Sequence, residues 1–202
     1  MIYKVASIVF LLAFSSLVSA QSFEAMFGTK RIFIDAQYLE FFDEENKISL
    51  FSRARATAEY DNQNSDLFTG AYLNYTTKSG FGGTVLGRIA SGGSGIDAGV
   101  HYFKATRSVM IYALPSININ DKLLYSWFSI IRYTPTINKD LKMYTSLELF
   151  SAFNEIGHLS SVQRIRLGVD KKSYQFGVAV NLNERRYLDT DVNPGVFLRK
   201  QF

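Results

Sequence analysis

Apolar and polar residues alternate along almost the whole chain after residue 20, and this period of two is typical of β-strands. Most of the alternating segments have about ten residues or more, the length that a tilted strand needs to cross a bilayer. Strands of soluble proteins average about five or six residues. We therefore predict an all-β fold, a single antiparallel up-and-down transmembrane β-barrel. Eleven segments carry the pattern: residues 30–42, 47–60, 67–78, 81–90, 96–105, 108–118, 122–133, 140–153, 159–170, 173–183 and 195–202.

The number of strands follows from the turns between these segments. Short polar turns nearly alternate with longer links, as in barrels with short periplasmic turns and longer outer loops. The short turns are 43–46, 78–80, 120–121, 138–140 and 170–172, and the longer links are 61–66, 91–95, 154–158 and 183–194. Bacterial single-chain barrels usually have an even number of strands. We predict about twelve strands, with residues 21–27 as the missing one. The alternatives are that this segment threads the lumen, or that the barrel has ten strands.

The first 20 residues predict an export signal. Lys4 supplies the positive charge, residues 5–18 form an apolar run, and Val18-Ser19-Ala20 is a small-residue cleavage site. The alternative is a retained membrane anchor, but the run is shorter than the roughly 20 residues of a spanning helix. We predict a signal peptide over 1–20 and the barrel over 21–202.

Composition excludes several classes of function. The chain has no cysteine, so a domain exported without disulfides must be held by its fold alone. Without Lys4, 21 of the 22 basic residues stand against 18 acidic ones. This mild excess contains no Lys/Arg run, and we expect no nucleic-acid partner.

The last segment ends on an aromatic residue at the C-terminus. Val196, Leu198 and Phe202 share one face, and Arg199 and Gln201 lie on the other. With the export signal, this ending resembles the closing strand of bacterial outer-membrane β-barrels, and the short Asn/Asp/Lys turns resemble those of the Bacteroidota. The resemblance implies location in the outer membrane, contact with its lipid, and recognition of Phe202 by the barrel-assembly machinery. Lys200 stands where the family prefers an apolar residue, and we expect its amine to reach the membrane interface.

Charged residues within the alternating segments predict what faces the lumen. In 47–60, Arg53, Arg55 and Glu59 share a face opposite Ala54 and Ala56. A charge on the lipid face costs roughly 2–4 kcal/mol at the midplane, so the charged face must look inward. The predicted lumen charge cluster comprises Arg53, Arg55, Glu59, Arg88, Arg132, Glu148, Arg164, Arg166 and Arg199, with Asp35, Asp97 and His101 on the same parity.

Two interpretations of this cluster remain open. The arginines and carboxylates can pair and make a small barrel rigid, because buried charges need partners. Alternatively, they can form an arginine-rich constriction that selects anions. Both fit an outer-membrane barrel of structural or passive small-solute transport type, with anions as the favoured solute.

One short motif suggests catalysis. His158-Leu159-Ser160 is similar to the His/Ser arrangement of outer-membrane lipid A deacylases, in which a histidine activates a serine and a carboxylate orients the histidine. Residues i and i+2 of a strand share a face, and Glu148 and Glu155 are the nearest carboxylates. The rest of the chain adds no match, so the lipid hydrolase using His158 and Ser160 is an alternative and the sequence does not predict an enzyme.

No ligand set for a metal and no phosphate-binding loop is recognisable, so we expect no metal and no cofactor. The third alternative is a soluble exported barrel, lipocalin-like, with an apolar cavity. Its alternation would be reversed, with charges outside. The orientation of Arg53, Arg55, Arg164 and Arg166 therefore separates the two kinds of barrel.

Overall fold

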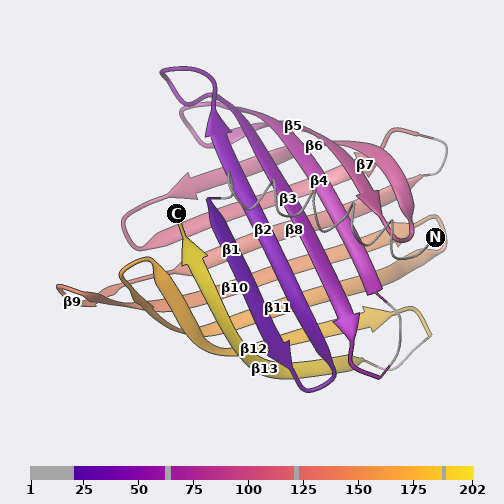
Figure 1. Ribbon diagram of the computed structural model, residues 1–202. Helices are drawn as coiled ribbons and strands as arrows, with labels where there is room; N and C mark the ends of the chain where they lie inside the picture. Colours follow the sequence, from indigo (N-terminus) through magenta and orange to yellow (C-terminus); the bar gives the residue numbers. More distant parts are fainter. Residues whose placement is uncertain (1–20, 62–64, 121–122, 188–189) are drawn as a thin grey trace, which may run out of the picture.

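The protein is a closed antiparallel β-barrel (Figure 1). The computed structural model describes residues 21–61, 65–120, 123–187 and 190–202. Each long strand pairs with the next along the chain, and β1 pairs with both β2 and β13, which closes the ring. The strands are β1 Ser22–Gly28, β2 Arg31–Phe41, β3 Ile48–Glu59, β4 Ser65–Thr76, β5 Phe81–Ala90, β6 Gly93–Ala105, β7 Val109–Asn118, β8 Leu124–Tyr133, β9 Thr136–Asn138, β10 Leu141–Asn154, β11 Gly157–Lys171, β12 Tyr174–Arg185 and β13 Asp191–Gln201.

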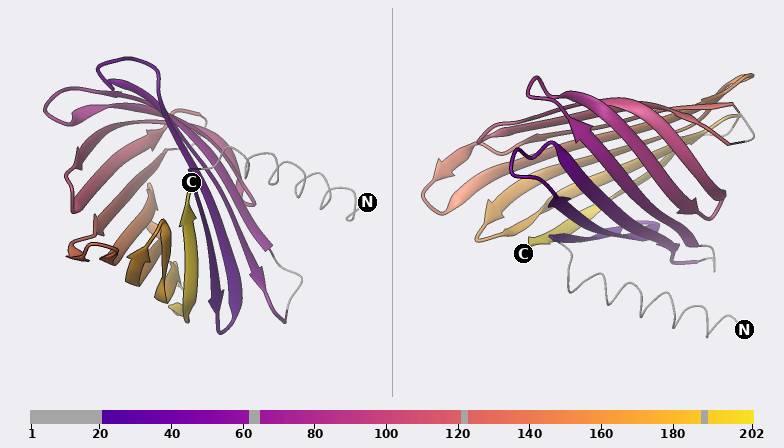
Figure 2. Two further views of the ribbon diagram at one scale, coloured as in Figure 1. Left: turned by 60° about the vertical axis from the view of Figure 1, so that its left-hand side comes forward. Right: turned by 90° about the horizontal axis from the view of Figure 1, so that it is seen from above.

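The barrel has twelve strand positions around its ring, as predicted, and we call each of these positions a stave. The three-residue β9 pairs only with β10, next to the place where β8 pairs with that strand, so β8 and β9 together form one stave. The predicted twelfth strand is β1, and residues 21–27 neither thread the lumen nor lie apart from the sheet. Two further views show the strands running obliquely around the barrel (Figure 2).

Two predicted outer loops are tight turns instead. Only two residues separate β5 from β6 and β10 from β11. Gly93 and Gly157 have positive φ values of 126° and 113°, which glycine adopts without a steric penalty. The Asn154 side chain also accepts a hydrogen bond from the N–H of Ile156 at 3.0 Å. The last link is shorter as well, because β12 reaches Arg185 and β13 already begins at Asp191.

Both ends of the described chain lie at the same end of the barrel, since the number of staves is even. The N–H of Phe202 donates to the carbonyl of Gln21 at 3.0 Å. We call this the terminal end. The turn between β2 and β3 lies there too, and Asp43 organises it by accepting the N–H groups of Ile48 at 2.6 Å and Lys47 at 3.0 Å. These bonds favour the charged carboxylate and hold the pKa of Asp43 below its ordinary value.

The outer wall of the barrel is apolar. Large side chains at alternate positions of nearly every strand are exposed, among them Leu73, Val85, Val100, Trp127, Leu167, Val178 and Leu198, with exposures between 44% and 64%. Soluble monomers rarely expose continuous apolar surface on this scale. Aromatic side chains stand out near strand ends, including Phe42, Tyr60, Tyr75, Tyr133, Phe153 and Tyr174.

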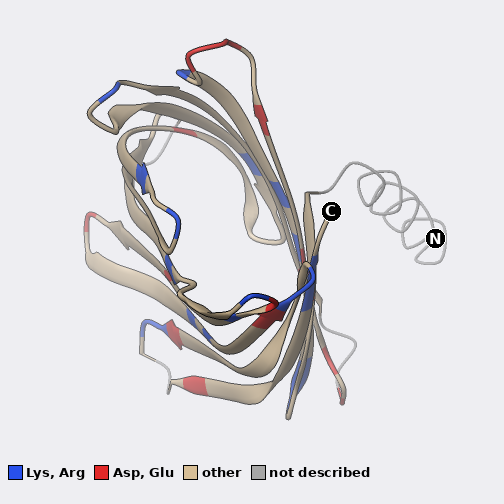
Figure 3. Ribbon diagram, turned by 90° about the vertical axis from the view of Figure 1, so that its left-hand side faces the viewer, with Lys and Arg blue, Asp and Glu red and all other residues tan. Residues whose placement is uncertain are grey.

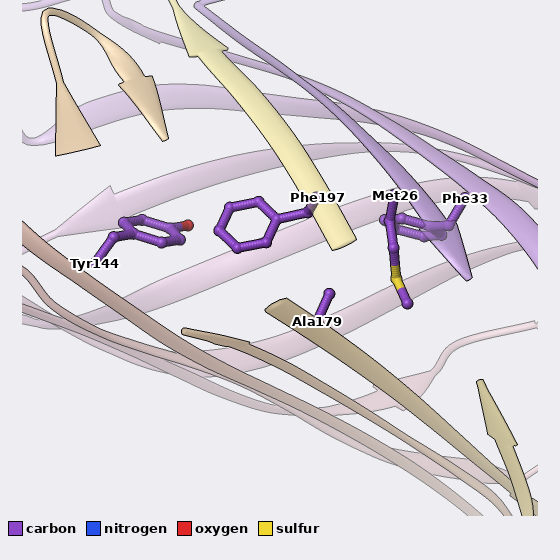
Figure 4. Packing of buried hydrophobic residues seen from close by; sticks show 5 residues of the cluster. All are labelled: Met26, Phe33, Tyr144, Ala179 and Phe197. Carbon is purple, nitrogen blue, oxygen red and sulfur yellow. The ribbon is translucent and has the colours of Figure 1, made fainter. Parts of the chain in front are cut away.

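Part of the inner wall is apolar, in addition to the charged side chains that the alternation predicts there. Met26, Phe33, Tyr144, Ala179 and Phe197 form one buried cluster from β1, β2, β10, β12 and β13 (Figure 4). A second cluster on β4, β5, β7 and β8 comprises Tyr72, Leu86, Leu114, Phe128 and Ile130. A small barrel leaves an interior that side chains can fill, so its inward positions pack like a core.

Within the part of the chain that the structure describes, no helix is long and apolar enough to cross a membrane. The predicted signal peptide, residues 1–20, lies outside the described residues.

Candidate functional site: an interior network of arginines and carboxylates

The four arginines that distinguish the two kinds of barrel are buried together. The side chains of Arg53, Arg55, Arg164 and Arg166 are 3%, 12%, 14% and 4% exposed. Their neighbours point the other way: Ile165, which lies between the last two, is 39% exposed. This orientation contradicts the soluble alternative, which requires the arginines outside. Figure 3 marks the charged positions on the strands and turns.

Arg53 is the centre of the network because it bridges two carboxylates from different strands. Its Nε and Nη2 donate to the two oxygens of Asp35 on β2, at 2.7 and 2.8 Å. Nη2 also lies 2.7 Å from Oε2 of Glu148 on β10. Bidentate contacts of this kind combine charge with fixed geometry. The bridge spans the barrel interior from β2 and β3 to β10.

Glu148 collects three arginines. In addition to Arg53, it accepts hydrogen bonds from Nη2 of Arg55 at 2.8 Å and from Nη1 of Arg164. Arg164 stands directly opposite Glu148 in the β10–β11 register, whereas Arg55 reaches it from β3. Glu148 is 5% exposed, so its charge is compensated by these guanidinium groups rather than by water.

A third carboxylate, Glu24 of β1, also belongs to this site, although the predicted lumen cluster does not include it. Its Oε1 accepts a hydrogen bond from Nε of Arg166 at 2.8 Å, and its Oε2 lies 4.0 Å from Nη1 of Arg199. Glu24 alternates with the apolar residues Phe23 and Ala25, which is the pattern of an inward charge. The segment is so short that this alternation is weaker than in the longer strands. Register places Glu24 opposite Asp35 on one side and Arg199 on the other.

Two arginines donate their hydrogen bonds to neutral groups. Arg132 on β8 donates Nη2 to the amide oxygen of Gln37 at 3.1 Å, and Arg199 on β13 donates Nη2 to the same oxygen at 3.0 Å. Arg199 also donates to the hydroxyls of Ser22 at 2.7 Å and Tyr144 at 3.4 Å. No ion pair of Arg132 is found among the described residues.

We call these residues the interior network. It contains six arginines and three carboxylates, so positive charge exceeds negative charge by three among the described residues of the network. Several guanidinium N–H groups are buried without a hydrogen-bond acceptor in the described structure: Nη1 of Arg53 and Nε of Arg55, Arg132, Arg164 and Arg199. The members are Glu24, Asp35, Arg53, Arg55, Arg132, Glu148, Arg164, Arg166 and Arg199.

Aromatic faces cover part of this excess charge. Arg164 and Arg166 lie over the ring of Phe33 at 5.0 and 5.7 Å. Arg53 lies 6.0 Å from the ring of Phe128, a member of the second apolar cluster. Such cation–π contacts stabilise the charge of a guanidinium. The aromatic ring does not, however, accept hydrogen bonds from the N–H groups that lie in the plane of the guanidinium. Arg53 therefore sits at the junction between the network and the apolar cluster.

Two predicted members of the lumen cluster lie elsewhere. Arg88 donates Nε to Asp97 at 2.6 Å, and Asn118 donates to the other oxygen of that carboxylate at 2.8 Å. Glu59 accepts Nε of Arg31 at 3.0 Å, near the end of the barrel opposite the terminal end. The cluster is thus divided into separate groups, because period-two alternation predicts a face but not a height along the barrel.

The interior has little free space at the network and more beside it. A space of about 20 Å³ remains among the charged side chains, roughly enough for one water molecule. A second cavity of about 410 Å³ lies at the terminal end. Gln37, Arg132 and Arg199 line both spaces, so they separate the cavity from the rest of the network.

His101 is buried in the wall of the larger cavity with both ring nitrogens bonded. Nε2 pairs with Thr76 at 2.9 Å and Nδ1 with Thr84 at 2.8 Å. Gly82 stands opposite His101, and a Cβ there would come within 2.6 Å of the imidazole. Within the described ranges, no three His, Asp or Glu side chains are grouped so that they could hold a metal ion.

The structure does not bring the predicted catalytic pair together. His158 bonds through Nε2 to the hydroxyl of Ser161 at 2.8 Å, not to Ser160. A register shift between Ala152 and Phe153 breaks the rule that residues i and i+2 share a face. Ser160 lies opposite the buried Ala152, whereas His158 lies opposite the exposed Phe153. Among the residues described, no carboxylate bonds to His158.

The fold and the site define a closed twelve-stranded antiparallel barrel with an apolar outside and a charged, packed interior. Solved structures with this architecture include the KdgM porin, with a TM-score of 0.55 and 14% identity over 90% of this chain and 98% of that one. The NanC porin gives 0.54 and 9% over 90% and 98%, and LpxR from Salmonella typhimurium gives 0.50 and 10% over 90% and 99%. At these identities the likeness shows the fold. No protein-family model and no curated relative matches the chain.

Proposed function

We propose that the chain is an outer-membrane β-barrel that passes small anionic solutes slowly, with the interior network as its selective element. The apolar outer wall supports placement in a bilayer, where every backbone group must be paired within the protein. Closure of the ring by β1 and β13 meets that requirement.

The observation that carries the anion preference is the charge balance of the network. Three positive charges in excess, held by a low-dielectric wall, attract anions and repel cations. The guanidinium N–H groups without acceptors add unused donors that an anion can engage. A cation passing the same point would meet carboxylates that arginines already occupy.

The fold neighbours support this class of function. KdgM and NanC are described as porins, and KdgM has been solved in complex with oligogalacturonate, a carboxylate-bearing oligosaccharide. We extend only the chemical class to this chain: a small solute that carries negative charge. The narrow space at the network favours small ions over oligosaccharides.

The orientation in the membrane forms part of the proposal. We place the terminal end on the periplasmic side, with Phe202 as the residue that the barrel-assembly machinery recognises. Phe202 is 68% exposed, which leaves it accessible to a partner. Lys200 lies 5.2 Å from the ring of Tyr174 and 5.0 Å from that of Phe202, an arrangement that suits an amine at the membrane interface.

Conductance of the purified protein in a planar bilayer tests this function. We expect small steps in potassium chloride, because the network leaves little free space. Under a salt gradient the reversal potential should have the sign of an anion-favouring pore. Large cation-favouring steps would refute the proposal.

A further inference from the structure

We propose that the cavity at the terminal end binds a monocarboxylate that carries an apolar group, with the carboxylate held by Arg132 and Arg199. This inference goes beyond the passage of anions, because it concerns a resident ligand and does not require a continuous path through the barrel.

The cavity has a mouth and a floor. Its mouth is formed by exposed residues at the strand ends and turns of the terminal end: Gln21, Phe41, Asn46, Gln201 and Phe202. Its floor is formed by Gln37, Arg132 and Arg199, which also border the small space inside the network. A volume of about 410 Å³ falls within the range of small-molecule sites, which are roughly 300–1,000 Å³.

The floor is built for an anion. Arg132 and Arg199 share one neutral acceptor, the amide oxygen of Gln37, and Arg199 also donates to the hydroxyls of Ser22 and Tyr144, with Glu24 at 4.0 Å from its Nη1. Arg199 is only 4% exposed, yet its Nε and the Nε of Arg132 have no acceptor in the described structure. Buried donors without partners are costly, and charged ones more so. A carboxylate has two oxygens and so can accept N–H groups from two guanidiniums at once.

The walls above the floor are largely apolar. Phe51, Met110 and Ile130 line the cavity, and all three belong to or pack against the second apolar cluster. Ile130 is 4% exposed and therefore contributes a dry surface. A fully hydrated sugar acid would lose water against these side chains without replacing its hydrogen bonds, whereas an alkyl or phenyl group would gain from burial.

The polar groups of the wall are already bonded to one another. The Thr84 hydroxyl donates to Oδ1 of Asn74 at 2.8 Å, and Thr84 and Thr76 bind the two nitrogens of His101. The Tyr112 hydroxyl lies 3.5 Å from the same Asn74 oxygen, and its ring stacks on His101 at 5.7 Å. These groups do not need a ligand, so the arginines at the floor are the point of attachment.

Titration of the barrel in lipid nanodiscs with 4-phenylbutyrate tests the inference. We expect saturable binding by calorimetry, and weaker binding of 4-phenylbutyramide, which has the same shape but no charge. Acetate, which has the charge but no apolar group, should also bind more weakly. Loss of a charge-assisted bond predicts a tenfold or greater weakening, on the order of the cost of one such bond, for the amide and for Arg132→Gln.

Two further variants keep the test informative. Arg88→Gln removes an arginine that lies outside the cavity and should bind 4-phenylbutyrate as the wild type does. Met110→Glu places a carboxylate opposite Arg132 in the β7–β8 register, where it would occupy the arginine and compete with the ligand. Equal affinity for the acid and the amide would overturn the inference, as would unchanged binding by both Arg132→Gln and Met110→Glu. Neither result would bear on conductance, so the proposed function is tested separately.

Discussion

Glu148→Gln lowers the free energy of unfolding by about 3–5 kcal/mol, the cost expected when one partner of a buried ion pair is removed. Glu148 is the shared partner of Arg53, Arg55 and Arg164. Glutamine keeps the shape of the side chain but leaves three guanidiniums to repel one another. Denaturant unfolding in lipid vesicles, followed by fluorescence of the single tryptophan Trp127, measures the change.

Glu155→Gln is the matched control for this prediction. Glu155 is exposed in the turn between β10 and β11, so the same chemical change there should alter stability little. Removing Arg164 together with Glu148 should recover part of the loss, because one unpaired charge disappears with it. If Glu148→Gln unfolds at the same denaturant concentration as Glu155→Gln, the network does not stabilise the barrel.

The double variant Arg53→Ala/Asp35→Ala opens the barrel interior and raises the unitary conductance severalfold. The two residues form a neutral pair, so the excess of three positive charges is kept while the junction with Phe128 loses its central side chain. Glu148 still binds Arg55 and Arg164. Single-channel recording should therefore show larger steps with the same anion preference.

Arg88→Ala/Asp97→Ala serves as the control, since it removes another neutral ion pair away from the network. We expect it to change conductance little. If both double variants conduct like the wild type, solutes do not cross at the network. If the Arg53/Asp35 variant conducts more but favours cations, the charge argument is wrong.

The barrel could be predicted from the sequence because the alternation of apolar and polar residues follows the two-residue period of a β-strand. A strand with one face outside the barrel and one face inside must place Arg53 and Arg55 opposite Ala54 and Ala56, and in the structure both arginines are buried inside. The strand formed by residues 21–27 was also predicted, because an even number of strands requires one more than the eleven alternating segments. Short strands such as β1 carry too few repeats to be recognised alone.

The composition of the interior could not be predicted in the same way. Alternation predicts which face of a strand a side chain occupies, but not which strands face each other across the barrel. The hydrogen bond between Arg55 and Glu148 could therefore not be predicted. Alternation places Phe128 and Phe197 on the inward face with Arg132 and Arg199, but it does not show that they gather into apolar clusters. A single bulge near Ala152 was enough to separate His158 from Ser160.

Quenching of Trp127 tests most directly whether the apolar outer wall lies in lipid. Trp127 lies within β8, is 44% exposed on the outer wall, and is the single tryptophan of the chain. In vesicles of lipids brominated on the acyl chains, we predict strong quenching of its fluorescence and little quenching by aqueous iodide. Strong quenching by iodide without an effect of the brominated lipids would show that this wall faces water, and would contradict the membrane barrel.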